Sequence, residues 1–200
     1  LLSAPGSQHV RVTIHEASGI VGRGVAYGTS DPRHLLNVRA RHMSAWPDVP
    51  SDLLEWAART GREVDPQGFL PRRDYAAYLQ DTLASVADHR LTVRAGRVDD
   101  VVPRPEGGYE LHAAGTVSVA DSVVLAYGNQ EPRALVVDGD TLPPAPWHVP
   151  NPWDLAALHL LPGDATAVVV GTVAVICSVV TTVTGVGELL PFWMTREPVT

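Results

Sequence analysis

The first candidate for chemistry in this chain of 200 residues is an acidic side chain at the end of a predicted strand. Residues 10–16 alternate β-branched and polar types, which predicts a strand that closes on Glu16. In dinucleotide-binding βαβ units, the acid at the end of the second strand accepts hydrogen bonds from the adenosine ribose. The glycine turn that binds the pyrophosphate lies upstream of that strand, and here it would fall before Leu1. A strand that merely ends in glutamate at a sheet edge remains the alternative.

The segments after Glu16 carry the most distinctive letters of the chain. They read GRGVAYG over residues 22–28 and DPRHLLNVRARHMS over residues 31–44. Three further segments follow in order: FLPRRDY at 69–75, VVLAYGN at 123–129 and NPWD at 151–154. Together they resemble the bacterial FAD/NAD(P)-binding protein family, Rossmann-type flavoproteins related to FAD-dependent hydroxylases. The resemblance covers residues 8 to 171.

This resemblance implies roles for the residues near the predicted ribose end of the cofactor. Glu16 would bind the adenosine ribose. Gly22, Arg23 and Gly24 would form a loop rich in exposed backbone beside the cofactor, with the guanidinium of Arg23 available to a phosphate.

The resemblance also implies contacts at the flavin side. Asn37 and Arg39 lie where the family's chain passes the flavin, and Arg73 and Tyr75 would open the helix that borders the site.

Two further segments correspond to the family's contacts with FAD and NAD(P): the turn at residues 126–128 and the segment after Gly171. Ala126 and Gly128 match the turn that approaches the cofactor through bare backbone, where glycine permits close contact. Tyr127 stands where the family usually has Thr, so a large ring must be accommodated there or crowds the cofactor. After Gly171 the family continues with a second glycine turn that opens the NAD(P) helix, whereas this chain reads GTVAVICSVV and diverges.

Each of these residue types also has a plainer interpretation. Arg39, Arg41 and Arg72 fit solvated surface charges as well as they fit cofactor contacts, and Tyr75 fits the core face of a helix. The histidines show no metal-ligand spacing, so we predict no metal site. No Ser-His-Asp or paired-carboxylate arrangement is present to assign as catalytic. A flavoenzyme needs none, because the isoalloxazine ring transfers the electrons and the protein orients it.

The elements that must position these residues alternate between helix and strand. Ser51 and Gly61 bound one predicted helix, and a second is expected over residues 73–89. The face of the second helix contains these apolar residues: Tyr75, Tyr78, Leu79, Leu83 and Val86. Four short strands at 91–94, 98–104, 109–113 and 116–119, with a Gly107-Gly108 turn, predict an antiparallel β-meander over about 91–120. Apolar runs at 121–126 and 167–170 predict buried strands of a parallel sheet.

The expected fold is α/β: a Rossmann-type three-layer FAD/NAD(P)-binding fold with an inserted β-meander, whose first strand is missing. Residues 1–130 would form a partial FAD-binding domain that opens on the last turn of a helix. Residues 131–154 would form a Pro-rich linker, and 155–200 would start a second nucleotide-binding half. Residues 165–187 carry no charge. A frame change near Thr172, genuine divergence and a membrane segment remain open as explanations of this apolar tail.

Composition narrows the classes of function. The net charge of −7, with no basic run interleaved with aromatics, argues against nucleic-acid binding. A single cysteine, Cys177, excludes an internal disulfide framework and any multi-cysteine zinc or iron–sulfur site, and favours the cytoplasm.

The sequence therefore predicts a flavin-dependent oxidoreductase or monooxygenase, or an incomplete fragment of one, that binds FAD, uses NAD(P)H as reductant and acts on a small-molecule substrate. Two alternatives stay open. One is a non-catalytic remnant that no longer binds cofactor, and the other is a membrane-associated protein that uses the apolar tail.

Overall fold

The computed structural model describes residues 2–126, 128, 132–143, 145–151, 153–154, 156–157, 160, 162 and 166. The chain divides into two compact units, Leu1–Asn129 and Gln130–Thr200. Each unit is described by itself.

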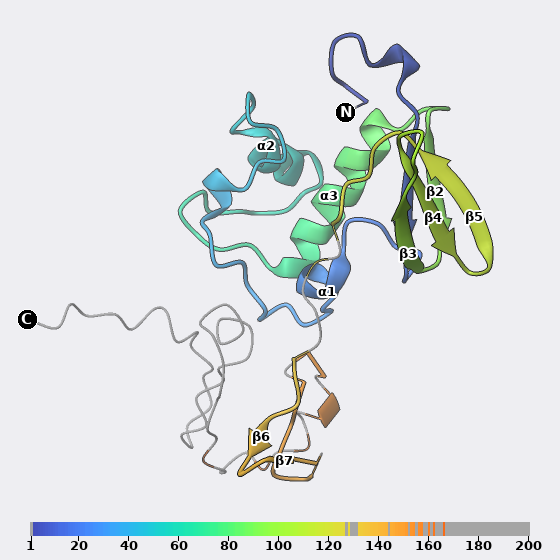
Figure 1. Ribbon diagram of the computed structural model, residues 1–200. Coiled ribbons are helices and arrows are strands. Elements are labelled where there is room, and N and C mark those ends of the chain that lie inside the picture. Colours follow the sequence, from blue (N-terminus) through green and yellow to red (C-terminus); the bar gives the residue numbers. More distant parts are fainter. Residues whose placement is uncertain are drawn as a thin grey trace, which may run out of the picture. The chain divides into compact units, whose positions relative to one another are not determined.

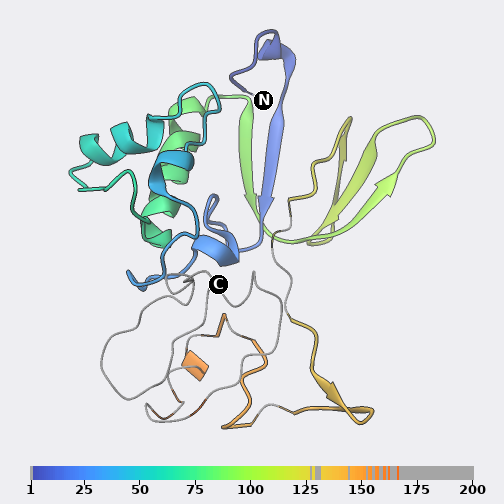
Figure 2. The ribbon, with the colours of Figure 1, turned by 90° about the vertical axis from the view of Figure 1, so that its left-hand side faces the viewer.

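The first unit is organised around a parallel pair of strands, β1 (Val12–Glu16) and β2 (Leu91–Ala95) (Figure 1). Val12 lies opposite Leu91, and Glu16 lies opposite Ala95. Parallel strands need a long crossover, and here it contains the helices α1 (Gly24–Tyr27), α2 (Asp52–Arg59) and α3 (Arg72–Val86). Figure 2 shows these helices on one side of the pair and the remaining strands of the unit on the other.

The helices pack around one apolar core. Its buried residues are Leu36, Ala40, Leu53, Trp56, Ala57, Leu70, Tyr75 and Tyr78. Both predicted helices form, and α3 begins at Arg72 and ends at Val86, close to the predicted bounds. On its predicted face the two tyrosines are buried, while the leucines and the valine are half-buried.

Two polar contacts join the helices within this core. The indole Nε1 of Trp56 donates to Oδ2 of Asp81 at 2.7 Å. The hydroxyl of Tyr78, which has no exposed surface, donates to Oδ2 of Asp52 at 2.6 Å and accepts from the N–H of Ala45 at 2.8 Å. Each buried polar group is thereby satisfied, which fixes α2 and the preceding loop on α3.

The antiparallel meander contains three strands, β3 (Val98–Pro103), β4 (Tyr109–Ala113) and β5 (Thr116–Ala120). The prediction that the meander starts at residue 91 is wrong at its first strand, because β2 pairs with β1. The physical reason is the crossover through α3, which returns β2 parallel to β1, and Gly96, with φ +139°, then separates β2 from β3. The predicted turn at Gly107 and Gly108 forms, with both residues at positive φ.

The predicted buried strand at 121–126 is also wrong. These residues form no regular element, and Val124 and Leu125 are 80% and 68% exposed. Among the described residues β1 pairs with β2 alone, so no strand stands beside the free edge of β1 to bring this segment into the sheet. Apolar composition favours a strand only where a neighbour completes its hydrogen bonds.

Residues 2–6, predicted as the last turn of a helix, form turns that lead into the 3₁₀ helix η1 (Ser7–His9). A second 3₁₀ helix, η2 (Ala40–His42), precedes α2. The second unit has a short hairpin, β6 (Val136–Val137) and β7 (Asp140–Thr141), inside the segment read from the sequence as a linker.

The predicted strand at 167–170 and the sequence from Gly171 onward lie outside the described residues. Within the part of the chain that is described, no helix is long and apolar enough to cross a membrane.

Candidate functional site

Glu16 lies at the carboxyl edge of the parallel pair, where β1 ends. Its carbonyl accepts the N–H groups of Gly19 at 3.0 Å and Gly96 at 3.1 Å, so the chain leaves both strands at one point. Its carboxylate Oε1 accepts from the N–H and hydroxyl of Ser18 at 3.0 and 2.9 Å. No donor among the described residues binds Oε2. Glu16 therefore has one oxygen held in place by the turn and one available to a ligand.

The loop after Glu16 lies against α3. The side chain of Gln80 donates to the carbonyl of Val21 at 3.2 Å. Gly22 has φ +84°, and a Cβ there would meet the side chains of Leu79 and Gln80 at 3.4 Å. The left-handed backbone therefore requires glycine at Gly22. The distances of 3.4 Å to α3 are ordinary van der Waals contacts, so space alone does not exclude a side chain there. The predicted loop instead contains one helical turn, α1, which begins at Gly24.

The side chain of Arg23 links the start of α1 to its end. Its Nη2 donates to the carbonyl of Gly28 at 3.1 Å, so part of the guanidinium is engaged. Gly24, with φ +51°, has open space where a Cβ would be. The ring of Tyr27 meets that of Tyr75 edge to face at 5.0 Å, which attaches α1 to α3.

The first turn of α3 holds the rest of the loop in place. Arg72 is 8% exposed, and its guanidinium donates to the carbonyls of Leu35 at 2.9 Å and Ala26 at 3.1 Å. The interpretation of Arg72 as a solvated surface charge is therefore wrong: two loop carbonyls satisfy its buried charge. Arg73 is exposed and donates to the carbonyl of Ser30 at 3.2 Å. Tyr75 lies in the core, as its plainer interpretation had it.

Asn37 and Arg39 lie on an exposed stretch that borders the core. Among the described residues, neither side chain makes a hydrogen bond or ion pair with β1. The guanidinium of Arg39 donates to the carbonyl of Gln67 and lies over the ring of Phe69, 5.5 Å from its centre. This arrangement pairs two loops, and it engages Arg39 without burying it.

Ala126 and Gly128 are both exposed, and Gly128 has φ +64°. In Figures 1 and 2 the yellow stretch that follows β5 runs toward the carboxyl end of β1 and β2.

The structure therefore brings some of the predicted site residues together and leaves others apart. Helix α3 holds the predicted residues of the loop beside those of its own first turn, whereas Asn37 and Arg39 lie apart from them, next to the 67–69 loop.

The pKa of one carboxyl group in the loop, that of Asp31, is strongly lowered. Arg33 donates to both oxygens of Asp31, the closest contact being 2.7 Å, and these hydrogen bonds hold the pKa of the Asp31 carboxyl well below its usual range. The pair rigidifies the turn that follows α1, and it leaves no free carboxylate there to repel an anion.

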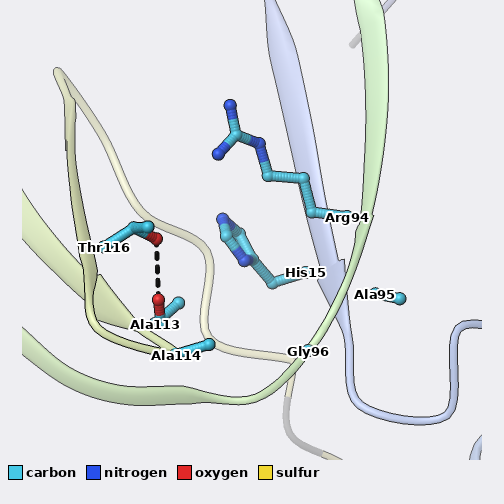
Figure 3. Close-up of a pocket in the computed structure, with 7 residues that line it drawn as sticks. All are labelled: His15, Arg94, Ala95, Gly96, Ala113, Ala114 and Thr116. Atoms are coloured by element: carbon cyan, nitrogen blue, oxygen red, sulfur yellow. Dashed lines mark hydrogen bonds between the residues drawn. The ribbon is translucent and has the colours of Figure 1, made fainter.

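A pocket that the sequence did not indicate opens beside this edge. It has a volume of about 370 Å³ and lies between the parallel pair and the β4–β5 turn (Figure 3). It is lined by His15, Arg94, Ala95, Gly96, Ala113, Ala114 and Thr116. His15 and Arg94 are register partners in β1 and β2. The sequence predicted both strands. It did not predict that they pair, and only their pairing brings His15 and Arg94 together, because the two residues are far apart in the chain.

The described part of the chain contains no group of three or more His, Cys, Asp or Glu side chains that could hold a metal ion.

Comparison with known proteins identifies one family. A sequence model described as FAD-NAD(P)-binding matches residues 1–130, which is more than half of the chain. No curated protein matches the chain.

Proposed function

The chain belongs to the FAD-NAD(P)-binding family, and from this premise we propose that it is a flavin-dependent oxidoreductase of the monooxygenase type. FAD would be bound by the first unit, with NAD(P)H as reductant and a small organic molecule as substrate. The observation that carries the proposal is Glu16, whose carboxylate stands at the end of a parallel strand with one oxygen held and one available.

Glu16 suits the adenosine ribose for a simple reason. A ribose presents two hydroxyl donors, and an ionised carboxylate is an acceptor only. Because Ser18 occupies Oε1, the carboxylate is oriented before the ligand arrives, and Oε2 would receive the ribose. Such preorganisation lowers the cost of binding.

The loop after Glu16 suits the phosphate side of the same ligand. Gly22 and Gly24 present backbone without side chains, and part of the Arg23 guanidinium remains for an oxyanion. Asn37, Arg39, Arg73, Ala126 and Gly128 would border the flavin end. Tyr75 would act indirectly, since its ring supports α1 from the core.

When bound, the flavin would accept a hydride from the nicotinamide and pass electrons to oxygen or another acceptor. The chain's own residues would bind and orient it. No described residue is assigned a proton-transfer role. The scarcity of cysteine supports a cytoplasmic protein.

A titration of the full chain with FAD, followed by quenching of flavin fluorescence, tests the proposal. Glu16→Gln keeps a carbonyl oxygen for Ser18 but replaces the available oxygen with a donor. Loss of a hydrogen bond to a charged group costs about 1.5–3 kcal/mol, so FAD affinity should fall about 10- to 100-fold. The matched control is Glu63→Gln, since Glu63 is exposed and distant in sequence from the site.

The proposal fails if the wild-type chain does not bind FAD, or if both glutamate variants bind it as the wild type does. A chain that is folded and colourless, and gains no thermal stability from FAD, would be a remnant without cofactor.

A further inference from the structure

We propose that the pocket between the parallel pair and the β4–β5 turn is a second binding site, which takes the oxyanion group, phosphate or carboxylate, of a small molecule. It would be separate from the proposed ribose site at Glu16.

The two polar side chains of β1 and β2 that line this pocket are both nitrogen donors. His15 and Arg94 face each other across the parallel register, so their side chains emerge side by side on the same face of the pair. Figure 3 shows the two side chains next to each other, on the side of the strands where Ala113 and Thr116 of the meander lie. A guanidinium has a planar fork of donors that matches carboxylate and phosphate oxygens.

Neither donor is used by the protein within the part of the chain that is described. Arg94 and His15 make no hydrogen bond or ion pair there, whereas Arg33 and Arg90 each bind a neighbouring carboxylate. No Asp or Glu lines the pocket. An anion would therefore meet two donors and no competing or repelling carboxylate.

The rest of the lining leaves room for a ligand. The volume of about 370 Å³ lies within the range of small-molecule sites. Ala95, Gly96, Ala113 and Ala114 contribute only small groups. Thr116 donates its hydroxyl to the carbonyl of Ala113 at 2.7 Å, so the hydroxyl oxygen remains an acceptor at the wall. The pocket is thus a small space walled by small groups, with nitrogen donors at one side.

Its separation from the ribose site follows from strand geometry. Consecutive side chains of a strand point to opposite faces, so His15 and Glu16 face different ways. The pocket lies on the face of the pair covered by the meander, while the loop after Glu16 packs on α3.

The test is an NMR titration of the full chain with inorganic phosphate and, separately, with acetate at constant ionic strength. His15→Gln identifies the imidazole signals of His15, which should move on titration. Arg94→Gln should weaken binding of the preferred anion about tenfold or more, because it removes charge-assisted hydrogen bonds. Arg97→Gln, an exposed arginine outside the pocket, is the matched control and should change the affinity less than about twofold. The anion that binds more tightly identifies the ligand group.

Three results would overturn the proposal. One is that neither anion moves the His15 signals. Another is that Arg94→Gln and Arg97→Gln weaken binding equally, which would indicate a general charge effect. The third is that Arg94→Gln lowers FAD affinity as Glu16→Gln does, which would make the pocket part of the cofactor site.

Discussion

Buried polar side chains on α3 do more to shape the candidate site than the exposed charges that first draw attention in the sequence. Arg72 and Arg73 are neighbours in the chain and indistinguishable by composition. Their surroundings differ, because the guanidinium of Arg72 is enclosed and joins two loops, while Arg73 is exposed. Which of two adjacent helix residues points inward depends on the rotation of the helix about its axis. Arg72 lies three residues before Tyr75, so it falls on the buried face that the spacing of the tyrosines had predicted.

Replacement of Arg72 by Met should lower the free energy of unfolding by about 2–4 kcal/mol, because the carbonyls of Leu35 and Ala26 lose a charged donor. Arg73→Met should cost less than about 1 kcal/mol, since its contacts are exposed. Urea denaturation of the FAD-free chain measures both. Equal losses would contradict the role assigned to Arg72.

Tyr75 should make the folding stability of the chain fall at alkaline pH. Burial, and then the neighbouring hydroxyls of Tyr27 and Tyr78, raise the pKa of Tyr75 from 10.0 to about 12. Above pH 10 the unfolded chain loses this proton while the folded chain keeps it, so ionisation favours unfolding. The stability contribution is complete below pH 10 and should be lost as pH rises toward 12.

Tyr75→Phe should therefore stay within about 1 kcal/mol of the wild type near neutral pH, since the hydroxyl makes no hydrogen bond with the described residues. Between pH 10 and 12 it should lose less stability than the wild type. Urea denaturation across this range is the measurement, and the neutral-pH value is the internal control. Identical slopes for the two proteins would count against the assignment.

At the scale of elements, local signals predicted both longer helices and the strands of the first unit that form. Ser51 and Gly61 correctly bounded α2, and alternation marked β1. A run of short strands around the Gly107-Gly108 turn marked the three strands of the meander. Among the predicted strands that lie in the described residues, two assignments were wrong, and both errors were matters of pairing. Residues 91–95 joined β1 instead of the meander, and residues 121–126 found no neighbour. The periodicity of a sequence indicates which residues can form a strand. Whether the strand forms, and with which neighbour it pairs, depends on the other strands available to it.

The turn between β3 and β4 offers a matched comparison. Gly107 and Gly108 both have positive φ, but a Cβ at Gly108 would lie 2.7 Å from the carbonyl oxygen of Ala120, whereas the space at Gly107 is open. Gly107→Ala should cost about 1–2 kcal/mol from backbone strain alone. Gly108→Ala should cost about 1–3 kcal/mol more, because backbone must shift. Thermal denaturation compares them, and a larger loss for Gly107→Ala would refute this description of the turn.

At the scale of the whole molecule, the family match over residues 1–130 ends almost where the first compact unit ends, at Asn129. The ordered motifs led to the family because they are sequence signatures. They did not lead to the His15–Arg94 pocket, since it exists only where β1 meets β2 and both face the meander. The proposed site at Glu16 was thus within reach of the sequence, and the pocket beside it was not.

Hydrogen exchange of the full chain, followed by mass spectrometry with and without saturating FAD, tests the central claim most directly. If FAD binds at the carboxyl edge of the parallel pair, exchange should slow in peptides that cover residues 16–28 and Gly96. Peptides that cover β4 and β5 should exchange at the same rate in both states. Protection confined to the meander, or no protection of residues 16–28 under conditions where FAD is bound, would contradict the assignment of Glu16 and its loop as the cofactor site.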